Sequence, residues 1–335
     1  MLRADQYSDL LQAANTAFWR ARAAAWKTSS SNGSPTAPEE RLSLYHLIDT
    51  GLPELKKLWS AALNTPNLPL RLSGVMCDRT PLAIFDEVPK QRGTPSTVRK
   101  ELADLLVVYD RKGQRAVRRA LFLQAKRIDG MKIRSFDPEQ LRLYRDLPQM
   151  EIIGRDPRGR RFLQGRRDFS QDTDAFRYLL IEDNGCRHFH SRPHYSCCVH
   201  GCCGWQVSSP QGDVGRPGSE GLGATIVNMM CDVHPARAQE IKNLTNRTYP
   251  PLGAGDDLAI TVDEILTKTF YKKFGGPSGS SKRERGEVVS FHAGDATPTR
   301  GIEPGSGSWI PYGLERGGEE GGEAPFAVIL IEQDE

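Results

Sequence analysis

The sequence predicts an α/β protein in which a mixed central sheet is flanked by helices. Two short apolar runs, residues 105–109 and 120–123, are joined by a polar turn and predict neighbouring strands that are buried on both faces. Residues 5–27 carry apolar side chains at helical spacing, which predicts a long N-terminal helix. The segment 137–140 (Asp-Pro-Glu-Gln) combines an N-cap, a first-turn proline and a capping-box glutamine, so a helix is expected to begin there.

The remaining elements follow from the same periodicities and from turn residues. Helices are expected at residues 42–48, 54–63 and 258–274, the last with a capping box formed by Thr261 and Glu264, and Asp5 is the expected N-cap of the first helix. Strands are expected at residues 70–77 and 81–88, as a pair, and at 176–181 and 326–331, while 154–167 is a basic loop or hairpin.

The composition divides the chain into three parts. Residues 1–64 are an N-terminal helical part that packs on the core, and residues 65–184 are the expected core. Residues 185–335 are rich in Cys, His and Gly and irregular in pattern, and they form either an extension or the completion of the same domain.

Apolar composition and the first residues limit the location of the protein. No apolar run reaches the length of a membrane span, so we expect no membrane contact. Asp5 and Asp9 lie where a signal peptide would need its apolar segment, which favours a cytoplasmic protein. The seven cysteines are then expected to be reduced or bound to metal.

Three polar side chains are expected to meet on the hairpin. Gln124 and Lys126 are two residues apart on one strand and therefore share a face of the sheet. Antiparallel pairing places Asp104 opposite a residue between positions 121 and 125. Because unpaired charges are costly to bury, the sequence predicts either a structural ion pair or a functional site here.

Asp104 and the tripeptide Gln124-Ala125-Lys126 resemble the PD-(D/E)XK nuclease superfamily, whose fold is that of the restriction endonucleases. The resemblance is closest to the Mrr-like and related defence nucleases, in which glutamine replaces the acid of the (D/E)-x-K motif. It covers about residues 53–147, where an acid heads one strand, Gln-x-Lys ends the next, and a capped helix follows.

The resemblance implies a site that holds Mg²⁺ or Mn²⁺. Asp104, the side-chain oxygen of Gln124 and the backbone carbonyl of Ala125 would supply hard oxygen ligands. Lys126 would lie beside the attacking water and the scissile phosphate, where it stabilises negative charge.

A second carboxylate is needed because glutamine replaces one acid of the motif. Glu101 is the nearest candidate, although odd spacing on a strand would turn its side chain to the other face. Glu54 on the preceding helical region is the alternative, and Glu40 is a further acid that this region offers. Asp104, Gln124, Lys126 and Glu101 form the expected catalytic set.

A basic block surrounds the candidate site. Residues 111–167 contain 17 Lys and Arg against 6 Asp and Glu. Such a block suits a polyanion, although a solvated charged surface has the same composition. The expected nucleic-acid contacts are Arg127, Lys132, Arg134, Gln140, Arg158, Arg160, Arg161, Arg166 and Arg167.

Nine Cys and His residues lie between positions 186 and 203, and these side chains are preferred zinc ligands. The cluster is either a structural zinc site or a loop of cysteines without metal, and a redox role is a third alternative. The candidate zinc ligands are Cys186, His190, Cys197, Cys198, His200, Cys202 and Cys203.

The resemblance therefore implies a Mg²⁺-dependent endonuclease that acts on DNA within a prokaryotic antiviral defence system. The residues do not distinguish DNA from RNA, and partner subunits or an oligomer are compatible with such a role. A catalytically inactive nucleic-acid-binding or assembly subunit with the same fold is the alternative. A third reading makes the Cys/His cluster the functional centre.

Overall fold

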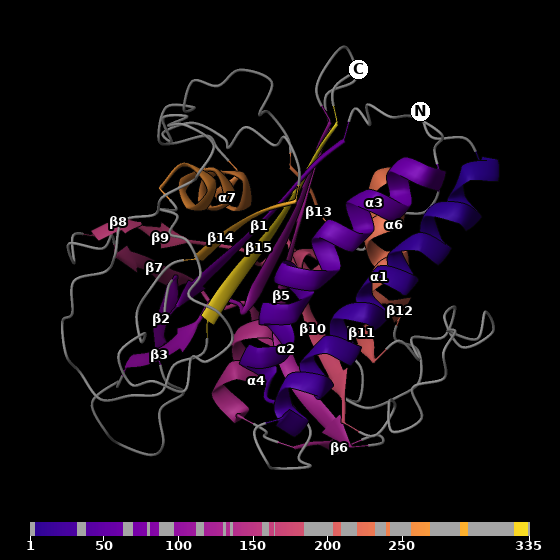
Figure 1. Cartoon of the computed structure of the whole chain (residues 1–335). Coiled ribbons are helices and arrows are strands. Elements are labelled where there is room, and N and C mark those ends of the chain that lie inside the picture. Colours follow the sequence, from indigo (N-terminus) through magenta and orange to yellow (C-terminus); the bar gives the residue numbers. More distant parts are fainter. Residues whose placement is uncertain are drawn as a thin grey trace.

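The structure, a computed structural model, describes residues 4–31, 38–62, 70–78, 81–86, 97–111, 117–129, 132–134, 137–155, 161–163, 165–183, 204–208, 220–231, 239–241, 256–268, 289–293 and 325–333. In these residues the chain forms two sheets flanked by helices, which confirms the predicted α/β class (Figure 1).

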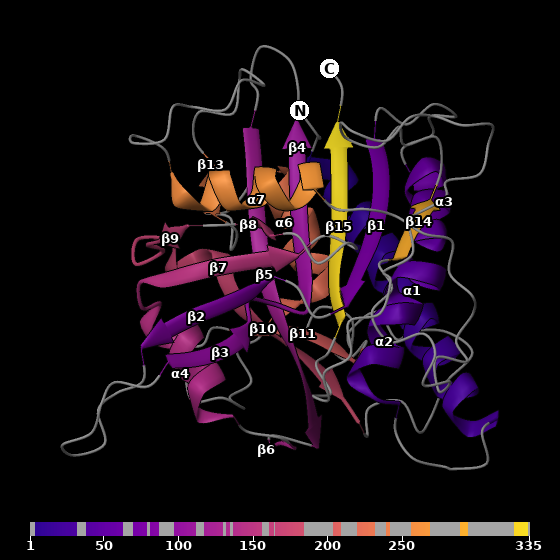
Figure 2. The same ribbon diagram turned by 90° about the vertical axis from the view of Figure 1, so that its left-hand side faces the viewer.

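The large sheet has ten strands, and its main path runs in the order β12-β11-β10-β5-β4-β15-β1-β14. The hairpin β4–β5 is antiparallel as predicted, whereas β10 lies parallel to β5 and β15 parallel to β4. Figure 2 shows β15, from the C-terminal end, between β4 and β1. The strands are β1 (Leu70–Asp78), β4 (Leu105–Arg111), β5 (Val117–Asp129), β6 (Lys132–Ile133), β10 (Phe176–Glu182), β11 (Trp205–Ser208), β12 (Glu220–Gly221), β13 (Gln239–Ile241), β14 (Val289–Ala293) and β15 (Pro325–Gln333).

The small sheet lies in front of the large one in Figure 2. It consists of β2 (Leu82–Asp86), β3 (Thr97–Glu101), β7 (Met150–Arg155), β8 (Arg161–Leu163) and β9 (Arg166–Arg167). The strands predicted at 70–77 and 81–88 exist, but their predicted pairing is wrong. β1 pairs with β14 and β15, while β2 pairs with β3 and β7. A break of a few residues suggests a hairpin locally, but the partners of β1 come from the distant C-terminal end of the chain.

Helices cover the large sheet on one face, and α4 and the small sheet cover the other. Side chains alternate along each strand, so Leu105 and Val107 face the helices while Leu106 and Val108 face α4 and the small sheet. The helices on the first face are α1 (Ala4–Ser31), α2 (Glu40–His46), α3 (Leu52–Ala62) and α6 (Leu222–Cys231). Those on the second are α4 (Pro138–Asp146) and α7 (Asp257–Lys268), with a 3-10 turn at Thr173–Ala175.

The predicted helix starts are partly confirmed. Asp137 caps α4, because its Oδ1 accepts bonds from the backbone N–H groups of Glu139 at 3.0 Å and Gln140 at 3.2 Å. The Gln140 side chain does not complete a capping box, since it bonds elsewhere. The predicted break near residue 51 is a π-helical turn (Leu47–Gly51) between α2 and α3.

Two other predicted caps are wrong. α1 already includes Ala4, so Asp5 lies inside the helix. In α7 the cap is Asp256, whose Oδ1 accepts from the Leu258 N–H at 3.0 Å. Thr261 lies a turn further on and donates its hydroxyl to the Asp257 carbonyl at 2.7 Å. Ser, Thr and Asp side chains bond nearby backbone groups both at a helix cap and inside the first turns of a helix. The residue pattern alone therefore does not show which of these residues is the cap.

The described parts of residues 185–335 complete the same body as the core. They supply β11 to β15, α6 and α7, and α1 packs directly against α6. Residues 186–203, with all candidate zinc ligands, lie outside the described residues. No helix in the described ranges is both long and apolar enough to cross a bilayer.

Replacing Asp172 with asparagine is expected to stabilise the protein above pH 6. Asp172 is 7% exposed; burial is the main cause that raises its pKa to about 6, and the nearby charges of Asp256, Asp257 and Asp168 add to it. The raised pKa means that stability falls as pH rises through 6. The variant should therefore gain up to about 3 kcal/mol at pH 8, since one pKa unit corresponds to about 1.4 kcal/mol.

Urea unfolding at pH 5 and pH 8 measures this effect, and the gain should shrink at the lower pH. Asp86→Asn is the matched control, because Asp86 is exposed on β2. An equal gain in both variants, or no pH dependence of the gain, would contradict the assignment.

Candidate functional site

The site forms where the chain passes from the small sheet to the large one. β3 ends at Glu101 and β4 begins at Leu105, and the connecting residues 102–104 are fixed by two backbone bonds. Leu102 N–H donates to the Pro81 carbonyl at 2.9 Å, and Asp104 N–H donates to the Leu123 carbonyl at 2.9 Å. Asp104 is therefore held at the start of β4, beside the middle of β5, which continues to Asp129 and does not end at Lys126 as predicted.

Helix α4 holds this connection from the other side. The Gln140 amide donates to the Glu101 carbonyl at 3.2 Å, and the Tyr144 hydroxyl donates to the Leu102 carbonyl at 2.8 Å. Residues four apart on a helix share a face, so both side chains reach the same stretch of backbone. Both are buried, and Tyr144 also stacks on Tyr178. Gln140, predicted as a nucleic-acid contact, instead positions the backbone beside Asp104.

Asp104 and Gln124 meet as the hairpin register predicts. Asp104 Oδ2 accepts bonds from the Ala125 N–H at 2.6 Å and from the Gln124 side-chain amide. The two residues are only 1% and 3% exposed. Asp104 Oδ1 and Gln124 Oε1 are both buried and have no hydrogen-bond partner among the described residues. Buried acceptors normally have partners, so two such oxygens side by side need a physical explanation.

The charges around Asp104 favour a cation. Burial raises the pKa of Asp104 to about 7, the Lys126 ammonium opposes this rise, and the Glu40 carboxylate adds to it. The Ala125 N–H and a hydrogen bond with the Glu101 carboxyl also lower the pKa. A cation bound at this place would favour the carboxylate form of Asp104, because an opposite charge nearby favours the charged form of an acid.

The structure brings two of the three candidate second acids to Asp104. Glu101 acts on Asp104 although odd spacing on one strand would turn its side chain to the other face. The two residues are not on the same strand, because Glu101 ends β3, so that alternation does not apply. Glu40, at the start of α2, acts on Asp104 through its charge, and its Oε1 accepts a bond from the Arg127 N–H at 2.9 Å. Glu54 instead forms an ion pair with Arg20 on α1.

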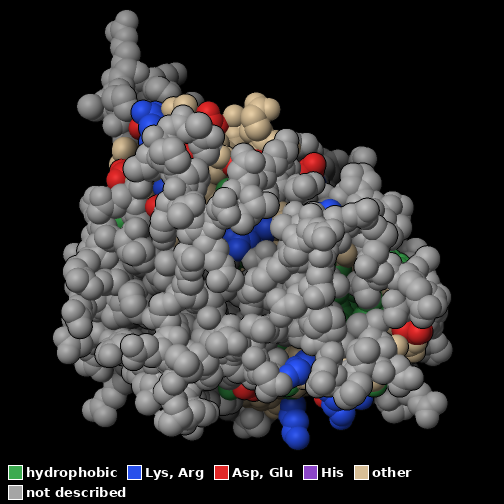
Figure 3. Space-filling model, turned by 90° about the horizontal axis from the view of Figure 1, so that it is seen from above, with side chains coloured by type: hydrophobic (Ala, Val, Ile, Leu, Met, Phe, Trp, Pro, Cys, Tyr) green, Lys and Arg blue, Asp and Glu red, His purple; other side chains and the backbone are tan. Residues whose placement is uncertain are grey.

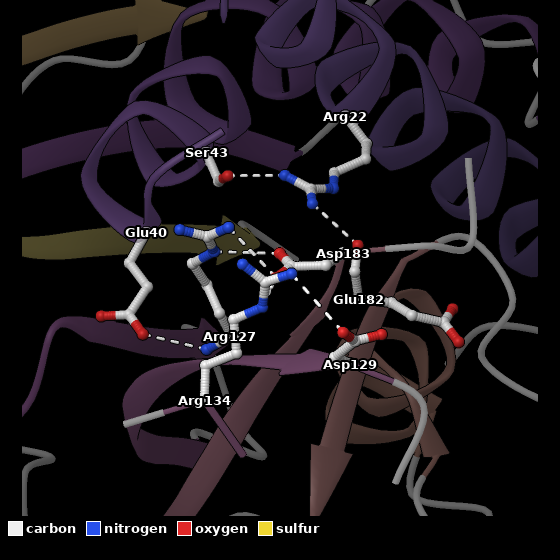
Figure 4. Close-up of polar contacts among 8 residues, drawn as sticks. All are labelled: Arg22, Glu40, Ser43, Arg127, Asp129, Arg134, Glu182 and Asp183. Atoms are coloured by element: carbon white, nitrogen blue, oxygen red, sulfur yellow. Dashed lines mark hydrogen bonds and ion pairs between the residues drawn. The ribbon is translucent and has the colours of Figure 1, made fainter. Parts of the chain in front are cut away.

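A network of ion pairs and hydrogen bonds around the buried Asp183 holds α2 against the end of β5 (Figure 4). Asp183 receives two bonds from Arg127, at 2.9 Å and 3.1 Å, and one from Arg134 at 2.5 Å. Arg22 on α1 donates to the Ser43 hydroxyl at 2.7 Å and to the Glu182 carbonyl at 2.8 Å. Ser43 lies one turn after Glu40 on α2, so this network fixes the acid near the site.

Several predicted nucleic-acid contacts are already paired within the protein. Arg127 and Arg134 bind Asp183, and the buried Arg167 binds Glu264 at 3.1 Å. Arg166 is exposed, as expected for a contact residue. The side chains of Lys132, Arg158, Arg160 and Arg161 lie outside the described residues.

The face seen in Figure 3 shows the described basic side chains at several separate places, interspersed with acidic ones. On this face, the described residues do not form one basic patch.

The candidate cation site rests on mixed oxygen ligands. Among the described residues, no group of three or more His, Cys, Asp or Glu side chains is arranged to hold a metal ion. The site nevertheless fits one, because the two buried oxygens without partners are of the hard type that Mg²⁺ prefers. The carboxylates would then be supplemented by Gln124 Oε1, the Ala125 carbonyl or water.

Comparisons with known proteins add no relative. No protein-family model, no curated protein and no solved structure matches the chain. The site must therefore be interpreted from its own residues.

Proposed function

We propose that the protein is a divalent-metal-dependent nuclease that hydrolyses phosphodiester bonds of DNA. The observation that carries this proposal is the pair of buried oxygens, Asp104 Oδ1 and Gln124 Oε1, beside the ammonium of Lys126. Oxygen acceptors without donors suit a hard cation, and a neighbouring lysine suits the phosphate that such a cation attracts. The resemblance to PD-(D/E)XK nucleases supports the same reading and extends it to a role in prokaryotic defence.

The residues divide the chemistry between them. Asp104, Gln124 and the Ala125 carbonyl would hold Mg²⁺ or Mn²⁺, with Glu40 or Glu101 as the second carboxylate. Such an ion would supply a Lewis acid and would activate a water for attack on phosphorus. Lys126 stabilises the negative charge that grows on the phosphoryl oxygens. Gln140 and Tyr144 would not bind the ion. They keep the backbone at residues 101–104 in place.

Lys126→Ala is expected to lower the rate of plasmid cleavage in Mg²⁺ about 10²–10³-fold, because one charge-stabilising donor contributes that much. Supercoiled plasmid incubated with wild type and variant, and resolved on a gel over time, gives the rates. Lys57→Ala is the control, since Lys57 is an exposed lysine on α3. No cleavage by the wild type with either Mg²⁺ or Mn²⁺, or equal cleavage by the Lys126 variant, would end the proposal.

A second candidate is a catalytically inactive nucleic-acid-binding or assembly subunit. It is favoured by glutamine at position 124, which leaves the candidate site with one carboxylate fewer than the (D/E)-x-K motif supplies. Calorimetric titration with Mn²⁺ separates the two functions. Metal-dependent heat that Asp104→Ala abolishes supports the nuclease, whereas salt-sensitive DNA binding without any metal heat supports the inactive subunit.

A further inference from the structure

One row of side chains crosses the outer face of the small sheet, the face turned away from α4 and the large sheet. The pairing register aligns Arg99 on β3 with Ile84 on β2, Ile84 with Glu151 on β7, and Glu151 with Arg166 on β9. Arg99, Glu151 and Arg166 are exposed and Ile84 is half-buried. Neighbouring strands are about 4.8 Å apart, so the two arginines stand about 14 Å from each other across the sheet.

These two arginines differ from most of the basic side chains around them. Among the described residues, neither Arg99 nor Arg166 has a hydrogen bond or ion pair through its side chain. The adjacent Lys100, which points to the inner face, binds Asp137 at 2.7 Å, and Arg167 on the inner face binds Glu264. Arg99 and Lys100 are neighbours on β3, and Arg166 and Arg167 are neighbours on β9. Side chains alternate along a strand, so in each case one basic residue points inward to a partner and the other points outward to solvent.

The row is continuous with the candidate site. Thr97, Arg99 and Glu101 are spaced by two residues on β3 and share a face, so Arg99 lies about 7 Å along the strand from Glu101. Glu101 ends β3, and only Leu102 and Ala103 separate it from Asp104 at the start of β4. A polyanion that reaches Asp104 and Lys126 therefore has the exposed Arg99 guanidinium next to it.

We infer that the outer face of the small sheet, through Arg99 and Arg166, binds the phosphate backbone of the nucleic acid next to the bond at Asp104. This rests on the proposed function for the identity of the ligand. Arginine binds phosphate oxygens in a bidentate manner, and exposed arginines keep their full charge for this contact. Glu151 lies between them and opposes the binding of a polyanion, which gives the inference a second, opposite test.

The test measures binding of a fluorescent DNA duplex by anisotropy in EDTA, where no cleavage occurs, at several salt concentrations. The double variant Arg99→Ala/Arg166→Ala is expected to lower the slope of log K against log salt by about 2, since each phosphate contact contributes about 0.9. Glu151→Gln is expected to tighten binding at every salt concentration. Lys57→Ala, which removes an exposed lysine from α3, is expected to leave the slope unchanged.

An unchanged slope in the double variant, or an equal change with Lys57→Ala, overturns the inference even if the protein cleaves DNA. A reduced slope supports it even if cleavage is absent, in which case the nuclease proposal fails alone. Because all three substituted positions on the sheet are exposed, the melting temperature of each variant should match that of the wild type and so exclude misfolding.

Discussion

Asp104→Asn is expected to lower the rate of phosphodiester cleavage about 10³-fold, because a bound metal contributes several kcal/mol to the transition state and the amide cannot supply its charged ligand. The substitution keeps the shape of the side chain. Its oxygen can still accept the bonds that Asp104 Oδ2 receives from Ala125 and Gln124. The loss of rate therefore reports on the charge rather than on the position of the group.

The same substitution is expected to stabilise the protein in EDTA at pH 8. Burial raises the pKa of Asp104 to about 7, so the folded state at pH 8 holds an ionised carboxylate at a cost that the neutral amide avoids. A gain of about 1–3 kcal/mol in the free energy of unfolding is expected, and it should shrink below pH 6.

Activity and stability measured together separate a functional site from a structural ion pair. If Asp104 served only to neutralise Lys126, its replacement would destabilise the fold and leave metal binding unaffected. Loss of cleavage with unchanged or higher stability excludes that role. Asp86→Asn, on the exposed end of β2, should change neither quantity.

The core of the candidate site could be predicted because it is local. Period-two alternation places Gln124 and Lys126 on one face, and a hairpin with a short polar turn leaves few registers for Asp104. The start of α4 was equally accessible, since Asp137 caps the first N–H groups of the helix and Pro138 suits its first turn. These features depend on neighbours in the sequence.

The rest of the site depends on contacts between distant segments. Glu40 approaches Asp104 only because Arg22 and Asp183, far apart in the chain, hold α2 against the end of β5. β15 enters the sheet from the C-terminal end and separates β1 from β4. No periodicity in the sequence encodes such pairings, because the energy that selects them comes from tertiary packing.

Arg99, the proposed phosphate contact, could not be identified from the sequence for a related reason. It lies outside the basic block of residues 111–167, and only the register of the small sheet aligns it with Arg166. Conversely, Arg127 and Arg134 belong to that block but are held by Asp183. Counting charges along the chain identifies basic segments, whereas burial and ion pairing decide which of the charges remain available.

Asp183→Ala is expected to lower the free energy of unfolding by about 3 kcal/mol, because removing one partner of a buried ion pair leaves the other uncompensated. Asp183 is 1% exposed, and the more buried of its two arginine partners, Arg127, is 19% exposed. The loss should also lower cleavage, since the Arg127 N–H binds Glu40. Urea unfolding and plasmid cleavage measure the two effects.

Arg134→Ala is the matched comparison, because it removes the other ion pair of the same carboxylate. The Arg134 side chain is 48% exposed, so its pair with Asp183 should contribute less than about 1 kcal/mol. Its loss should leave the salt dependence of DNA binding unchanged, because its charge is already matched inside the protein. If Arg134→Ala flattened the salt slope as strongly as Arg99→Ala, the basic connection after β5 would be the DNA-binding surface instead, since phosphate contacts alone set that slope.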